Sequence, residues 1–130
     1  MLAAWRPGDG RANYPMALDE LRGRLLVGLR SPASLVVLDT STGDVTQTLE
    51  GVGDVDDLFL DDAGHLFAVG GEGFVDVFVW AEGGTLDRVS RVATSPGART
   101  GLWVPEWNRL FVAAPRNGDV DARVLVFEVS

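Results

Sequence analysis

The 130-residue sequence contains no cysteine, no lysine and no isoleucine, and it has a single histidine. Without cysteine, the fold cannot use disulfide bonds or thiolate metal ligands. A single histidine also excludes a metal site built from several imidazoles of one chain. Arginine is the only strongly basic residue type, and this usage, together with the absence of isoleucine, indicates the codon bias of a GC-rich genome.

Positive charge is scarce. The net charge is −8 and the isoelectric point is about 4.4, which argues against sequence-independent binding to nucleic acid or anionic membranes. The apolar runs are short, such as Leu35–Leu38, so no membrane-spanning helix is expected. Residues Met1–Pro7 lack the features of a signal peptide. The chain as written fits a cytoplasmic protein, whereas a longer parent could be periplasmic or secreted.

The sequence repeats itself three times. The segment Met16–Gly28 returns as Leu58–Gly70 and again as Leu102–Ala114. Corresponding positions are 42 residues apart between the first two copies and 44 between the last two. A period of about 40–45 residues built from short strands is typical of a β-propeller blade.

Each repeat predicts short strands separated by turns rich in Gly, Pro, Ser and Asp. We therefore predict an all-β fold, a β-propeller of four-stranded antiparallel blades with about three blades in this chain. The first blade spans residues 13–52, the second 53–94, and the third 95–130 without its fourth strand. Within residues 1–12, the segment Leu2–Arg6 is expected to be the fourth strand of a preceding blade.

Three blades are too few to close a ring, because propellers have about four to eight. Two arrangements satisfy this constraint. The chain is part of a longer propeller and packs against its other blades, or two copies associate head to tail in a six-bladed ring. In the second arrangement, Leu2–Arg6 of one copy completes the last blade of the other.

The repeat units resemble those of the YncE-like, YVTN-repeat β-propellers of bacteria. The residues that carry this resemblance are Asn13–Asp19, Leu35–Val45 and Gly70–Phe78. Such propellers generally have seven blades, so the resemblance implies three C-terminal blades. It also implies a binding function, while related lactonase-type propellers hydrolyse sugar lactones and one branch is linked to DNA.

Propeller sites gather where the first strand of each blade begins and on the loops of the same face. This rule singles out four residues as candidates for binding a small molecule or a protein: Asn13, Arg30, Arg99 and Arg116. An arginine there can hold an anionic group with two hydrogen bonds. The alternative for Arg99 is a structural salt bridge to a neighbouring blade.

The same face carries the densest group of acidic residues in the sequence, Asp54, Asp56 and Asp57, and Glu72 is expected on a loop of that face. Carboxylate oxygens are the ligands that calcium prefers, so these four residues are the candidate metal ligands. The alternative is a set of solvated carboxylates without a metal. No catalytic residue can be assigned. We therefore expect a non-catalytic module for ligand or protein binding, with a metal-dependent lactonase as the alternative and a DNA-binding propeller as a second, which the negative charge disfavours.

Overall fold

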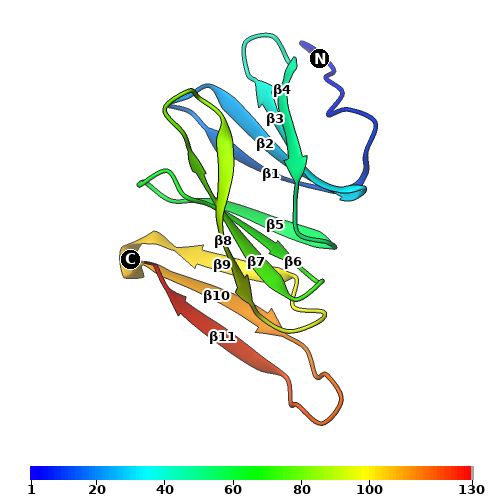
Figure 1. Cartoon of the computed structure of the whole chain (residues 1–130), viewed down its shortest axis with the longest axis vertical. Coiled ribbons are helices and arrows are strands. Elements are labelled where there is room, and N and C mark those ends of the chain that lie inside the picture. The colour runs from blue at the N-terminus through cyan, green and yellow to red at the C-terminus, as the bar shows by residue number, and fades with distance from the viewer. Residues whose placement is uncertain (130) are drawn as a thin grey trace.

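The computed structural model describes residues 1–129, which form three antiparallel sheets stacked from the N-terminal to the C-terminal part of the chain (Figure 1). The first sheet comprises β1 (Arg11–Asp19), β2 (Arg24–Ser31), β3 (Ala33–Asp39) and β4 (Val45–Glu50). The second comprises β5 (Val55–Leu60), β6 (Leu66–Gly70), β7 (Phe74–Trp80) and β8 (Leu86–Ala93). The third comprises β9 (Thr100–Val104), β10 (Arg109–Ala114) and β11 (Arg123–Glu128).

Within each sheet, consecutive strands are neighbours, so every sheet is a simple meander. The first strands of successive sheets lie next to one another, β1 beside β5 and β5 beside β9. This arrangement is that of consecutive propeller blades, which we call blades 1, 2 and 3. A short 3-10 helix, Pro105–Trp107, links β9 to β10. No helix in the described part of the chain is long and apolar enough to cross a membrane.

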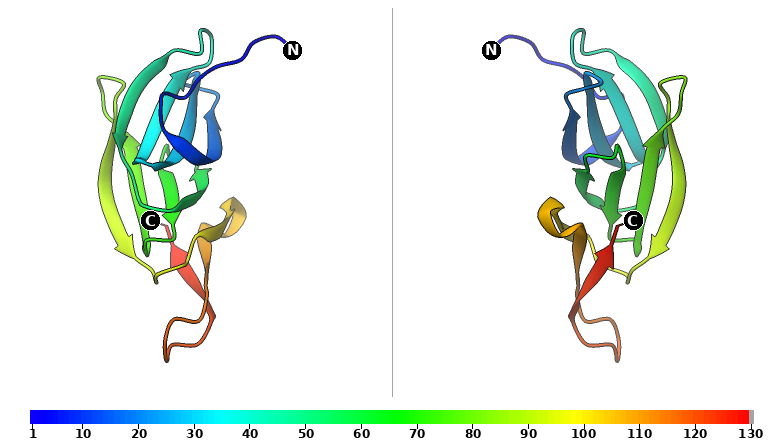
Figure 2. Two further views of the ribbon diagram at one scale, coloured as in Figure 1. Left: turned by 90° about the vertical axis from the view of Figure 1, so that its right-hand side faces the viewer. Right: turned by 90° about the vertical axis from the view of Figure 1, so that its left-hand side faces the viewer.

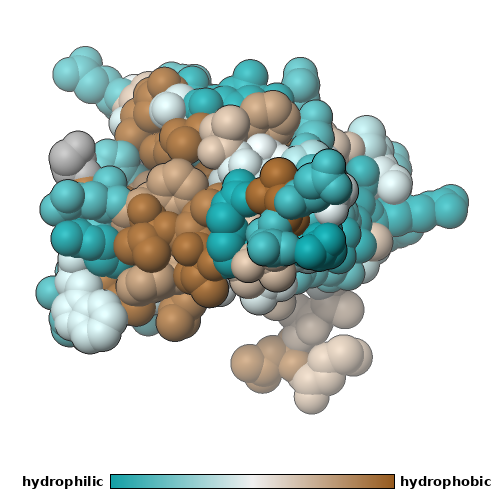
Figure 3. All heavy atoms as spheres, turned by 90° about the horizontal axis from the view of Figure 1, so that it is seen from below, coloured by the Kyte–Doolittle hydropathy of each residue, from teal (hydrophilic) through white to brown (hydrophobic). Residues whose placement is uncertain are grey.

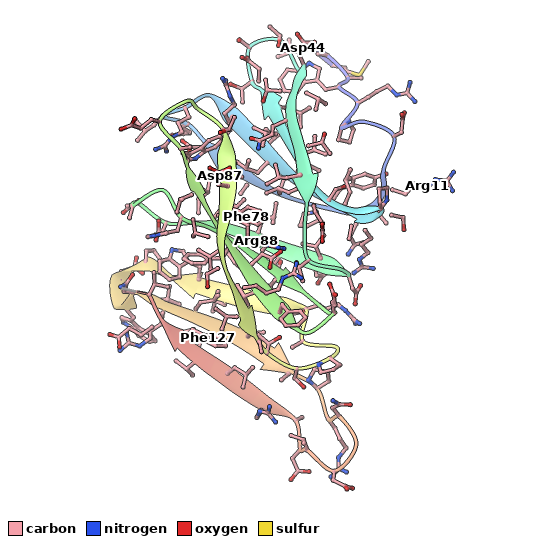
Figure 4. All side chains as sticks on the ribbon, viewed as in Figure 1. Arg11, Asp44, Phe78, Asp87, Arg88 and Phe127 are labelled. Carbon is pink, nitrogen blue, oxygen red and sulfur yellow. The ribbon has the colours of Figure 1, made fainter. Side chains whose placement is uncertain are left out.

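Alternation of side chains along the strands builds the interfaces between blades. Leu26 and Val37 of blade 1 are buried against Leu66 and Phe78 of blade 2, and Figure 4 places Phe78 in the middle of the molecule. The opposite face of blade 2 packs on blade 3 through a second buried cluster. Burial of each large aliphatic or aromatic side chain contributes about 1.5–3 kcal/mol, so the two interfaces hold the blades together.

The predicted all-β class and the pattern of four-stranded blades are confirmed. The strands occupy residues 11–50, 55–93 and 100–128, so β1 begins two residues before the predicted first blade, and the third sheet has three strands. Residues 1–10 form no strand in the single chain. The partner blade with which Leu2–Arg6 is expected to pair is outside this chain, so its role as a fourth strand stays a prediction.

Candidate functional site

At the end of the blades where β1, β5 and β9 begin, charged side chains of all three blades meet. Arg30, at the end of β2, reaches across to the start of β5. Its Nη2 atom lies 3.0 Å from Oδ1 of Asp54 and 3.3 Å from Oδ1 of Asp56. Its Nε donates a hydrogen bond of 3.3 Å to the carbonyl of Val55. Arg30 therefore fixes the connection between blades 1 and 2.

Two further side chains extend this contact in both directions. Arg99, just before β9, donates from Nε to Oδ2 of Asp54 at 2.9 Å. Asn13 of β1 donates from Nδ2 to Oδ1 of Asp56 at 2.6 Å. Arg30, Asp54, Asp56, Arg99 and Asn13 thus form one polar chain across three blades, which we call the blade-linking network. Opposite charges alternate along it, so each carboxylate is neutralised locally.

A glycine that the sequence analysis did not select makes room for this network. A Cβ atom on Gly71 would collide with Oδ2 of Asp54 and lie 3.0 Å from Nε of Arg99. The amide of Gly71 also donates to the carbonyl of Asp54 at 2.9 Å. Asp54 itself has a φ of 55°, in the left-handed region that aspartate tolerates better than most residues. The doublet Gly70–Gly71 after a strand was the sequence signal for this close approach.

The remaining candidates lie outside the network. Asp57 accepts a hydrogen bond of 2.8 Å from the amide of Gly101 in blade 3. Burial raises the pKa of Asp57 above its ordinary value, with a smaller contribution from the neighbouring Asp56, while the Gly101 amide opposes the rise.

Glu72 accepts a hydrogen bond from the amide of Gly53 at 2.7 Å, and Arg116 pairs with Asp121 of its own loop.

The four candidate metal ligands are therefore held by different partners. Asp54 and Asp56 bind Arg30, whereas Asp57 and Glu72 bind backbone amides. Within residues 1–129, no group of three or more histidine or acidic side chains is placed to hold one metal ion. A calcium ion would have to replace Arg30 at its two carboxylates. Calcium binding stays a prediction.

An open groove of about 800 Å³ adjoins the network, lined by residues of blade 3 and by Asp56 of blade 2. Arg99 and Arg123 line it together with Asp56, and Pro115 and Val124 supply apolar wall. The side chain of Arg99 is 47% exposed, so its guanidinium is accessible beside the contact with Asp54. Arginines next to apolar wall can bind a carboxylate and, at the same time, the aliphatic part of the segment that carries it.

No family model and no curated protein matches this sequence. Among solved structures, the chain is similar to one from "Crystal Structure of Mitotic Checkpoint Complex", with a TM-score of 0.68 and 14% sequence identity. The match covers 88% of this chain and 36% of that chain, so the present sequence spans about a third of its length. At this identity the likeness shows the fold alone, a β-propeller. The resemblance to the YncE-like family stays a prediction.

Proposed function

We propose that this chain is a non-catalytic protein-binding module, whose recognition surface is the blade-linking network and the adjoining groove. The observation that carries the proposal is the ion-pair chain Arg30–Asp54–Arg99, because it joins three blades at one surface. Such cross-blade pairing supports a preorganised surface, which loses little conformational entropy on binding. The similar solved chain comes from a multi-protein complex, an analogy of fold that favours the same class of function.

The lining of the groove suggests the chemistry of the partner. Arg99 and Arg123 face the groove, and among residues 1–129 Arg123 forms no ion pair. An extended segment with an acidic side chain would place its carboxylate between these arginines and its apolar atoms against Pro115 and Val124. Attraction between these charges is exposed to solvent, so binding should weaken as salt is added.

A peptide library displayed on phage tests the proposal. We expect the immobilised chain to select peptides that contain acidic residues, and to bind them in fluorescence anisotropy. The double variant Arg99→Gln/Arg123→Gln should lose this binding, whereas Arg109→Gln, at the other end of the blades, should keep it. Failure to enrich any peptide, or equal binding by both variants, would contradict the proposal.

The family resemblance implies the two alternative functions, and each has its own test. Hydrolysis of a sugar lactone that requires calcium and is lost in Asp56→Asn would favour the lactonase-type hydrolase. A complex with labelled duplex DNA that forms at low salt and dissolves as salt is added would favour the DNA-binding propeller. Either result, obtained without peptide binding, would replace the proposed function.

A further inference from the structure

An apolar pocket of about 190 Å³ lies between β8 of blade 2 and β11 of blade 3. Val75, Val77 and Val92 line it on one side, and Phe127 and Val129 on the other. β11 pairs with β10 along one edge, and no strand in the described part of the chain pairs along its other edge. The unpaired N–H and C=O groups of such an edge are a template for an added strand.

The corresponding place between blades 1 and 2 is filled. There, Leu86 of the fourth strand β8 is buried in one cluster with Leu35 and Val37 of blade 1 and with Phe78. Val75 and Val77 face blade 3 in the same way as Leu35 and Val37 face blade 2.

The ladders place two phenylalanines in corresponding positions. Phe78 pairs with Leu66 in blade 2, and Phe127 pairs with Leu110 in blade 3. Each of these leucines lies on the second strand of its blade and is buried against the preceding blade. The pocket therefore marks the place of one large aliphatic side chain from a fourth strand of blade 3.

The N-terminal segment has the features of that strand. Four residues, 7–10, separate Leu2–Arg6 from β1, and four residues, 51–54, separate β4 from β5. Trp5 packs against Gly43 in the turn between β3 and β4. Leu2 is fully exposed in the single chain. The segment thus lies beside blade 1, where the fourth strand of a preceding blade belongs, and presents a free leucine.

The two ends of the row of blades also have complementary surfaces. The outward face of blade 3 exposes Leu102, Val124 and Val126, each more than half accessible, and Figure 3 shows a broad apolar patch on this side of the molecule. At the other end, a cavity of about 650 Å³ separates the N-terminal segment from Tyr14 and Met16 on the outward face of blade 1. Figure 2 shows the N-terminal segment and blade 3 at opposite ends of the molecule.

We propose that β11 of one copy accepts residues 2–6 of a second copy as its fourth strand, with Leu2 in the pocket between β8 and β11. The apolar face of blade 3 then docks on the outward face of blade 1 of that copy. The exchange is reciprocal, so two copies close a ring of six blades, within the range that propellers adopt. Backbone hydrogen bonds of the added strand and one anchoring side chain stabilise this contact. The docked face shares Val124 with the groove near Arg99, so ring closure and peptide binding compete for that part of blade 3.

Leu2→Asp tests the proposal without disturbing the single chain, because Leu2 is fully exposed there. Leu21→Asp is the matched control, since Leu21 is also almost fully exposed but lies in the turn after β1. In sedimentation velocity we expect the wild type and Leu21→Asp at twice the 13.9 kDa of one chain. Leu2→Asp should raise the dissociation constant at least about 100-fold, because the ring contains the leucine contact twice.

A second pair of variants tests the docked face. Val126→Arg on β11 should also give single chains, whereas Val89→Arg, at an equally exposed valine of β8, should remain dimeric. A wild type that stays at 13.9 kDa at its highest soluble concentration would overturn the proposal. Equal behaviour of Leu2→Asp and Leu21→Asp, or growth into open-ended assemblies, would overturn it as well.

Discussion

Gln47 of β4 and Leu86 of β8 exchange two hydrogen bonds across the interface between blades 1 and 2. The amide nitrogen of the Gln47 side chain donates to the carbonyl of Leu86, and the Leu86 N–H donates back to Oε1 of Gln47, both at 2.8 Å. The glutamine side chain thus binds the start of β8 as a neighbouring strand would. Leu86 is buried, so its backbone depends on this one side chain for these contacts.

Gln47→Leu should destabilise the fold by about 1–3 kcal/mol, because it leaves the buried N–H and C=O of Leu86 without partners. Urea denaturation followed by tryptophan fluorescence measures the change. Thr48→Ala, at the next and exposed position of β4, is the control and should cost less than about 0.5 kcal/mol. Indistinguishable midpoints for the two variants would show that the bridge does not stabilise the interface.

Asp76 of β7 is completely buried, and Arg91 of β8 holds it with two hydrogen bonds of 2.6 and 2.9 Å. The hydrogen bond to Asp76 raises the pKa of Arg91 above its ordinary value. Arg91→Met should cost about 3 kcal/mol, because it strips a buried carboxylate of its main partner. Arg109→Met removes an arginine whose partner Glu128 is exposed, and should cost less than about 1 kcal/mol. The opposite ranking in thermal melts would contradict this assignment.

The raised pKa of Asp57 gives stability a defined pH dependence. The folded state binds the Asp57 proton more tightly than the unfolded chain does, so this contribution to stability is complete below the ordinary pKa of 3.8. It is lost as the pH rises through the folded-state pKa. The stability of Asp57→Asn relative to the wild type should therefore increase as the pH rises from the ordinary pKa of Asp57 through its folded-state pKa. Above the folded-state pKa this difference should level off. Urea titrations of the two proteins across this pH range measure the change, and a stability difference that does not vary with pH would contradict the assignment.

The calcium prediction requires Asp54 and Asp56 to exchange Arg30 for the ion. If calcium binds there, millimolar calcium raises the melting temperature by mass action, and Asp56→Asn abolishes the rise. Magnesium is the control, because it demands a stricter octahedral geometry and gives up its water less readily. Equal melting temperatures with and without calcium would contradict the prediction.

The face that carries the network and a salt bridge of Arg99 to a neighbouring blade could be predicted from the sequence, but the partners in the network could not. The repeats showed that Asn13, Asp54 and Arg99 begin equivalent first strands, and the structure brings all three to one end of the blades. The contacts of Asp54 with Arg30 and Arg99 join residues far apart in the chain. They depend on how the blades twist against one another, which periodicity does not encode.

The repeat alignment was also wrong by one residue in the second strand of blade 2. It matched Gly28 with Gly70. However, a Cβ atom added to Gly28 would contact Val55, which belongs to the following blade. A Cβ atom added to Gly70 would contact Val52, which lies on the side of the preceding blade. The ladders give the reason. Leu18 pairs with Leu25, whereas Leu60 pairs with Leu66, so the second turn is one residue shorter. A shift of one residue turns every side chain of a strand to the other face of its sheet.

The absence of cysteine permits the most direct test of the proposed ring. Copies carrying only Ala4→Cys are mixed with copies carrying only Val126→Cys, and a short bifunctional maleimide links cysteines that come close together. We predict a cross-linked product of twice 13.9 kDa from this mixture, and none when Val89→Cys replaces Val126→Cys. Equal cross-linking of both mixtures, or of neither, would contradict the addition of the N-terminal segment to β11.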